Sequence, residues 1–164
     1  MSRRSRAGLA VLALAACGGD GNDPVTPALD QIAPAVAAVE AELGGPPQFF
    51  EINATPQVVN LFVATDDAMQ VVPYVYVGGE LATAAEPAGA EGSTFGADAL
   101  TFDSATVLDA IEAELPDADV VLFSVAGGPG GAVQYTASVQ SADGGSLDVV
   151  LGPDGSVESV TPVG

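Results

Sequence analysis

Two stretches of the chain repeat apolar residues at the three- and four-residue spacing of a helix with one buried face. The first stretch runs from Leu29 to Leu43, and Gly44-Gly45 then ends it. Pro34 fits only a first turn or a kink, so the regular helix is expected to begin near this residue. The predicted buried side consists of Leu29, Ile32, Val36, Val39 and Leu43.

The second stretch shows the same spacing later in the chain. Asp103 or Ser104 is the candidate N-cap, because a short polar side chain there accepts from a free backbone N–H. Pro116 follows the last turn and cannot continue the helix. The two helices end alike, since residues 39–43 and 111–115 both read apolar-Glu-Ala-Glu-Leu. The predicted buried side consists of Val107, Leu108, Ile111 and Leu115.

After each helix the period changes to two, which is typical of short strands. In residues 133–140, apolar and polar side chains alternate, so one face is expected to meet the core and the other to meet water. Turn-forming residues separate the runs, namely Asp66-Asp67, Gly127 to Gly131, Asp143-Gly144-Gly145 and Pro153-Asp154-Gly155. The predicted strands are 49–54, 58–64 and 69–77 after the first helix, then 120–126, 133–140 and 147–151 after the second, with 157–161 as a further candidate.

This order predicts an α+β fold of two tandem helix-plus-antiparallel-sheet (α-β-β-β) repeats, which can share one continuous sheet. The first repeat covers residues 28–82 and the second covers 103–164. Residues 83–102, rich in Ala, Gly and Glu, are expected to connect them. A chance likeness between the two halves is the alternative.

The first 27 residues have a different composition from the rest. Basic residues precede an apolar run over residues 7–16, which is too short to span a bilayer, and Cys17 follows. The stretch Leu14-Ala15-Ala16-Cys17 resembles the lipobox of bacterial lipoproteins. The resemblance implies that residues 1–16 are a signal peptide and that a lipid on Cys17 anchors the chain to the bacterial cell membrane, outside the cytoplasm. An ordinary secretory signal with a chance cysteine is the alternative. Residues 17–27 are expected to form a flexible tether.

Charge is distributed unevenly along the chain. The three basic residues are Arg3, Arg4 and Arg6, there is no His, and the 22 acidic residues begin at Asp20. Self-repulsion is therefore expected to make stability depend on salt, with cations bound by diffuse screening. Binding to nucleic acid is excluded on the same ground, because phosphate contacts need Arg or Lys. A basic protein is the better electrostatic partner.

The usual catalytic side chains are missing after Cys17. Without His, Lys or a free thiol, the roles of general base, Schiff base and thiolate have no occupant. The carboxylates at 66–67 and 117–119 fall at predicted turns, and 127–131 lacks the Lys-Ser/Thr ending of a phosphate loop. Residues 20–23 have calcium-like spacing without the bidentate Glu of an EF-hand. We expect no enzyme, no cofactor and no metal site.

Tyr74 and Tyr76 are the candidate partner-binding residues. They share one face of the predicted strand 69–77, and exposed aromatic pairs anchor partners in many interfaces. Packing in the core or across strands is the alternative, since both faces of this run are apolar. Pro73 indicates that the strand lies at an edge or a bulge.

The second half resembles a PepSY-type domain in two stretches. The first is the helical stretch Thr106 to Ile111. The second is the run Leu147 to Val157, where an apolar strand is followed by a turn with Gly and a further Val. The first half resembles it more loosely, because its turn reads Gly78-Gly79-Glu80-Leu81. The resemblance implies an extracytoplasmic module that binds or restrains another protein. The leading hypothesis is a non-catalytic, membrane-anchored, protein-binding and inhibitory module. The alternative is a structural or cation-buffering acidic envelope lipoprotein.

Overall fold

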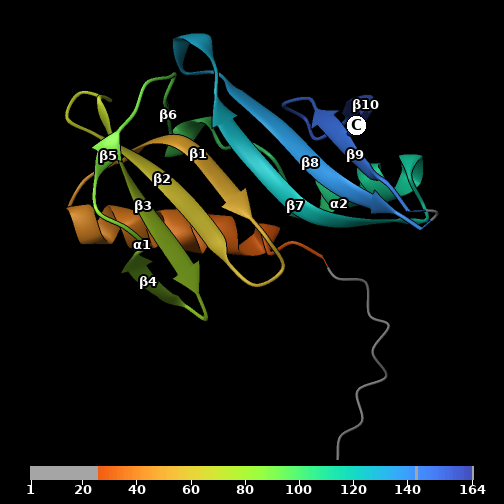
Figure 1. Cartoon of the computed structure of the whole chain (residues 1–164), viewed down its shortest axis with the longest axis horizontal. Coiled ribbons are helices and arrows are strands. Elements are labelled where there is room, and N and C mark those ends of the chain that lie inside the picture. Colours follow the sequence, from red (N-terminus) through yellow and green to blue (C-terminus); the bar gives the residue numbers. More distant parts are fainter. Residues whose placement is uncertain (1–25, 143, 164) are drawn as a thin grey trace, which may run out of the picture.

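The computed structural model describes residues 26–142 and 144–163, and one antiparallel sheet of ten strands forms its centre (Figure 1). The strand order is β10-β9-β8-β7-β1-β2-β3-β4, with β5 beside β3 and β6 beside β1. The α+β class and the continuous sheet are therefore confirmed. The strands are β1 (Gln48–Ala54), β2 (Val59–Thr65), β3 (Gln70–Val77), β4 (Glu80–Thr83), β5 (Ala88–Gly89), β6 (Phe95–Gly96), β7 (Ala118–Gly127), β8 (Val133–Ser141), β9 (Ser146–Leu151) and β10 (Val157–Val163).

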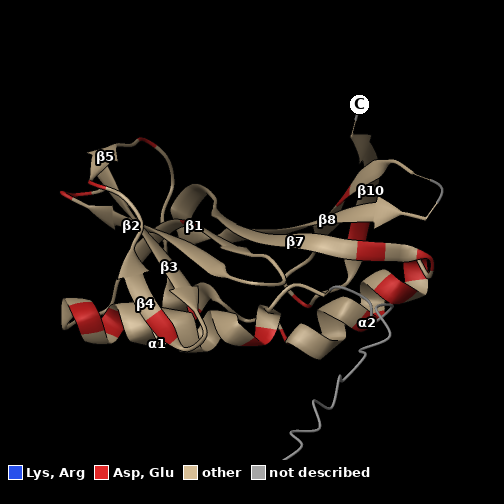
Figure 2. Ribbon diagram, turned by 60° about the horizontal axis from the view of Figure 1, so that its bottom comes forward, with Lys and Arg blue, Asp and Glu red and all other residues tan. Residues whose placement is uncertain are grey.

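The helices α1 (Ile32–Leu43) and α2 (Ser104–Glu114) lie on the same face of the sheet (Figure 2). Within the described residues, no helix is long and apolar enough to cross a bilayer. One face of the sheet is thus packed against helices, while the opposite face carries neither of them. We call this opposite face the uncovered face.

The helix α1 follows a short 3-10 turn (Leu29–Gln31) and ends at Gly44, whose φ of 71° places it in the left-handed region that favours glycine. The Gly44 N–H donates to the Glu40 carbonyl at 2.9 Å. Pro34 lies in the first turn, as expected. Burial of Leu43 was predicted wrongly, since its side chain is 46% exposed at the last helical position, where the chain turns away. The buried side is Leu29, Ile32, Ala35, Val36 and Val39.

The helix α2 is capped by Asp103, one of the two predicted candidates. Its carboxylate accepts from the Thr106 N–H at 2.8 Å and from the Thr106 hydroxyl at 2.9 Å. Val107 and Ile111 are buried as predicted. Leu108 and Leu115 are only partly buried, because they lie at the margin of the stripe that meets the sheet.

The strands β1 and β7 pair in the middle of the sheet, with residues 51–54 opposite 123–126. The main path of the sheet holds four strands after each helix, β1 to β4 and β7 to β10, with the short β5 and β6 also following α1. The α-β-β-β pattern was therefore one strand short for each helix, although the further candidate 157–161 is confirmed as β10. The short edge strand β4 was missed because its four residues are too few to show a clear alternation.

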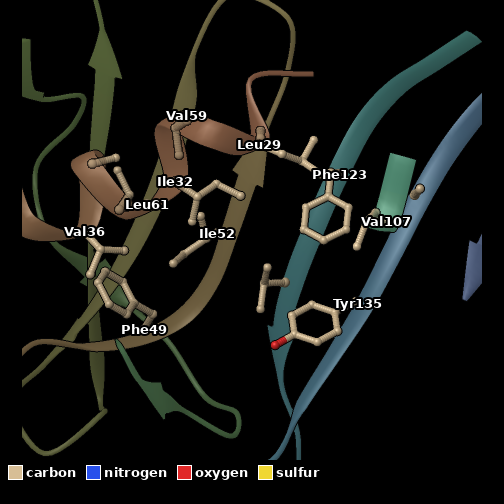
Figure 3. Close-up of a cluster of buried hydrophobic side chains, with 14 of the residues drawn as sticks. Leu29, Ile32, Val36, Phe49, Ile52, Val59, Leu61, Val107, Phe123 and Tyr135 are labelled. Carbon is tan, nitrogen blue, oxygen red and sulfur yellow. The ribbon is translucent and has the colours of Figure 1, made fainter. Parts of the chain in front are cut away.

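The core runs under both helices without a break (Figure 3). Phe49 and Ile52 lie beneath α1, while Val107 of α2 packs toward Phe123 and Tyr135. The buried Tyr135 hydroxyl donates to the Ala99 carbonyl at 3.1 Å and accepts from the Thr101 N–H at 3.2 Å. Its polar end is therefore satisfied within an apolar core.

The segment 83–102 does more than connect, in contrast to the expectation from its composition. It contains β5, β6 and a 3-10 turn (Ala97–Ala99), and it supplies an aromatic ring to each end of the core. Phe95 packs on Phe49 with ring centroids 5.8 Å apart. Phe102 packs on Phe123 at 5.1 Å and on Tyr135 at 5.3 Å.

Candidate functional site

The described residues contain no group of side chains arranged for catalysis. Among them there is no Lys, Arg or His, no buried charged or polar side chain, and no group of three His, Cys, Asp or Glu able to hold a metal. Figure 2 accordingly shows acidic residues on helices and turns and no basic residue in the part of the chain that is described. The remaining kind of site is a binding surface.

Asp103 and Asp154 have lowered pKa values because of hydrogen bonds that stabilise the fold. The pKa of Asp103 lies below its ordinary value because the backbone N–H and the hydroxyl of Thr106 donate to it. The pKa of Asp154 is lowered by the Ser156 hydroxyl at 2.6 Å and by the Ser156 N–H at 3.1 Å. One carboxylate caps a helix and the other closes a turn, so neither is held ready for proton transfer.

The middle of the uncovered face carries a line of neutral polar side chains across four neighbouring strands. Thr136 of β8 is opposite Ser124 of β7, Ser124 is opposite Asn53 of β1, and Asn53 is opposite Asn60 of β2. Their immediate neighbours along the strands are buried on the helix side, so the pleat directs these four side chains to the uncovered face. We call Thr136, Ser124, Asn53 and Asn60 the polar row.

Asn53 occupies the centre of the polar row. Its Oδ1 is buried from solvent and has no hydrogen-bond partner within the described residues. A buried acceptor without a donor costs about 1–3 kcal/mol. The sequence thus keeps a hydrogen-bonding group where an apolar residue would stabilise the sheet more.

The two ends of the uncovered face differ in chemistry. Beside β2, the side chains of Phe62, Val71, Pro73 and Val75 are partly buried, while Val77 is 49% exposed. We call these five residues the apolar patch. On β8 the outward side chains are Gln134, Thr136, Ser138 and Gln140, as the alternation predicted. Ser138 donates to Asp148 of β9 at 2.8 Å.

The aromatic pair Tyr74 and Tyr76 lies on the helix side of the sheet. Tyr74 is opposite Leu61, belongs to the core and is only 9% exposed. Tyr76 is opposite Val59 and packs, partly buried, against the same core. Packing therefore accounts for Tyr74, and partner binding by the pair stays a prediction.

The other sequence candidates have ordinary structural places or lie outside the described residues. Asp66 and Asp67 form the β2–β3 turn, and 127–131 ends β7 and turns into β8. Asp117 and Asp119 are exposed at the start of β7. Cys17 and residues 20–23 fall in the part of the chain that the structure does not describe.

The polar row was not recognised from the sequence. Each of its members is an ordinary strand residue in isolation, and only the pairing of β1 with β7, which are distant in sequence, brings them into line. The polar alternation in 133–140 was the one available signal. Comparison with protein-family models, with curated proteins and with solved structures found no match for this chain.

Proposed function

We propose that this chain is a membrane-anchored extracytoplasmic lipoprotein whose folded part binds another protein without catalysing a reaction. The observation that carries the proposal is the uncovered face of the ten-stranded sheet, with an unpartnered Asn53 acceptor at its centre. The lack of Lys, Arg and His after Arg6 supports the absence of catalysis. The lipobox-like residues Leu14 to Cys17 support the anchor.

The chemistry of the uncovered face indicates the kind of surface that it binds. Of the outward side chains of β1, β2, β7, β8 and β9, only Glu51, Asp119 and Asp148 are charged, whereas the rest of the protein is strongly acidic. A complementary partner supplies hydrogen-bond donors opposite the polar row, an apolar contact opposite the apolar patch, and basic residues around the rim.

The order of elements supports a tandem of two PepSY-like units. Each helix precedes four antiparallel strands, and β1 and β7, the first strand after each helix, pair at the centre of the sheet. Under this proposal the two units are joined through their first strands and present one shared face. An inhibitory role follows if the bound partner is an enzyme whose active site that face covers.

A structural or cation-buffering envelope lipoprotein is the second candidate. It is favoured by the spread of carboxylates over helices and turns, without a basic residue in the described part of the chain (Figure 2). Cations would be held there by the general field, since no group of three ligating side chains exists among the described residues. Such a protein has no need for the polar row.

The two candidates are separated by Asn53→Val. Removing the unpartnered acceptor is expected to raise the free energy of unfolding by about 1 kcal/mol, measured by urea denaturation. The same change should weaken capture of a saturable protein partner from an envelope extract at least tenfold. Thr83→Val, a similar change on the edge strand β4, is the matched control and should leave capture unchanged.

Two results would refute parts of the proposal. If Asn53→Val captured the partner as well as the wild type, the uncovered face would not be the binding surface. If only salt-sensitive uptake of cations were found, the buffering role would replace the binding role. Separately, mass spectrometry showing an unmodified Cys17 with residues 1–16 attached would remove the lipid anchor.

A further inference from the structure

A groove with an apolar floor and an acidic rim runs beside α2, on the side of the sheet opposite the uncovered face. A cavity of about 530 Å³ in this groove lies between α2 and the start of β7. Leu108 continues it toward the start of α2, and Pro116 and Ala118 continue it toward Leu147 of β9. The groove thus follows most of α2, whose 11 residues span about 16 Å.

The floor of the groove is apolar. Ile111 of α2 and Val120 of β7 are buried. Leu108, one turn before Ile111 on α2, is only partly buried. Leu108 therefore has apolar surface facing the groove that the described residues do not cover. A partner side chain placed there would remove this surface from water, which gains about 25 cal/mol per Å².

The rim of the groove is acidic. Glu112, Glu114 and Asp117 line it, and all three residues are exposed. Five of the 22 acidic residues fall within 109–119, the densest stretch in the chain. No basic side chain neutralises them, because none follows Arg6. An apolar floor flanked by one sign of charge is complementary to an amphipathic segment carrying the other sign.

We propose that this groove binds a basic amphipathic segment of a partner protein. A second copy of this chain is disfavoured as the occupant, since it carries the same uncompensated acidic charge. Residues 17–25, which remain after the proposed cleavage, are disfavoured for the same reason, because their charged side chains are Asp20 and Asp23. The groove is separate from the polar row, so this proposal and the proposed function can fail independently.

The test uses residues 17–164, the proposed mature chain, carrying Cys17→Ser, so that neither lipid, detergent nor the basic leader competes for the probe. The probe is a fluorescent 14-residue peptide of Leu and Lys in amphipathic helical order, and a scrambled peptide of the same composition is its control. Fluorescence anisotropy gives the dissociation constants. The ordered peptide should bind at least fivefold more tightly than the scrambled one, because only the ordered peptide presents an apolar stripe to the floor.

Matched variants separate the groove from the general field of the protein. The triple variant E112Q, E114Q and D117N removes three charges at the rim, and the triple variant E40Q, E42Q and E80Q removes three elsewhere. The rim variant should weaken binding of the ordered peptide at least tenfold, and the control variant less than threefold. Asn53→Val should leave this binding unchanged.

Two outcomes would overturn the proposal. Equal losses in the two triple variants would show that diffuse attraction alone holds the peptide. Equal binding of the ordered and scrambled peptides would show that the apolar floor plays no part. Leu108→Gln, checked by its melting curve to be folded, supplies a second measure and should weaken the ordered peptide at least fivefold.

Discussion

The two ends of the uncovered face are built on the same antiparallel pleat but differ in what they show to solvent. The β2–β3 end carries the apolar patch, whereas β8 carries Gln134, Thr136, Ser138 and Gln140. On the helix side both ends are apolar. Core packing thus constrains one face of every strand and leaves the other free to diverge. The difference between the halves lies in surface chemistry and in local detail more than in architecture.

The largest expected effect is on the unfolding free energy. It tests whether the β1–β4 and β7–β10 halves of the sheet depend equally on segment 83–102. Phe95 is 1% exposed and completes the core beneath α1. Phe95→Ala is expected to cost about 3–5 kcal/mol in unfolding free energy by urea denaturation. Phe102→Ala, beneath α2, should cost less because Phe102 is only partly buried. If both variants lost less than 1 kcal/mol of unfolding free energy, segment 83–102 would act only as a linker.

A smaller effect on stability is expected where segment 83–102 contacts β7. A Cβ at Gly127 of β7 would lie 2.2 Å from the Ser93 carbonyl oxygen, which belongs to the backbone and cannot rotate away. Gly127→Ala is therefore expected to cost about 2 kcal/mol, measured by thermal or urea unfolding. Gly89→Ala is the control, because open space surrounds that position. Equal stability of the two variants would contradict this close approach.

The turns of the two halves also differ, and this offers a stabilising change. The β2–β3 turn places Asp66, Asp67 and Ala68 at positive φ of 52°, 53° and 63°, whereas the β8–β9 turn uses Gly144 and Gly145. Ala68→Gly removes the steric cost of a Cβ in the left-handed region and should raise stability by about 0.5–1 kcal/mol. Ala113→Gly within α2 should instead lower it by about 1 kcal/mol.

The smallest effect concerns the helix starts. Asp103 caps α2 through its side chain, whereas Gln31 at the start of α1 makes no such bond. The folded-state pKa of Asp103 is lowered, so its contribution is present above the unfolded value near 3.8 and is lost as pH falls through the folded value. Asp103→Ala should lower the melting temperature by a few degrees at pH 7 and by less at pH 3. Gln31→Ala should show no such dependence on pH.

Local chemistry could be predicted from the sequence with good success. The left-handed Gly44 and the cap at Asp103 follow from what each residue type does at a helix end, and the alternation in 133–140 follows from one buried face. Such features depend on neighbours a few residues away. The helix positions and most strand positions were correct for this reason.

Features that depend on distant pairing could not be predicted. The pairing of β1 with β7, the partnership of Phe95 with Phe49, and the exposure of Leu43 are decided by which elements meet in space. The polar row and the groove beside α2 belong to this class. Each surface combines residues from at least two elements that are far apart along the chain.

The place where the chain enters the fold has a consequence for access. Thr26 borders the groove beside α2 and therefore lies on the helix side of the sheet. Eight residues lie between it and Cys17, and the nine Cα–Cα steps span about 30 Å at full extension. If Cys17 carries the proposed lipid, the described part of the chain is tied to the bilayer from its helix side, the side of the groove. The uncovered face lies on the opposite side of the sheet (Figure 2).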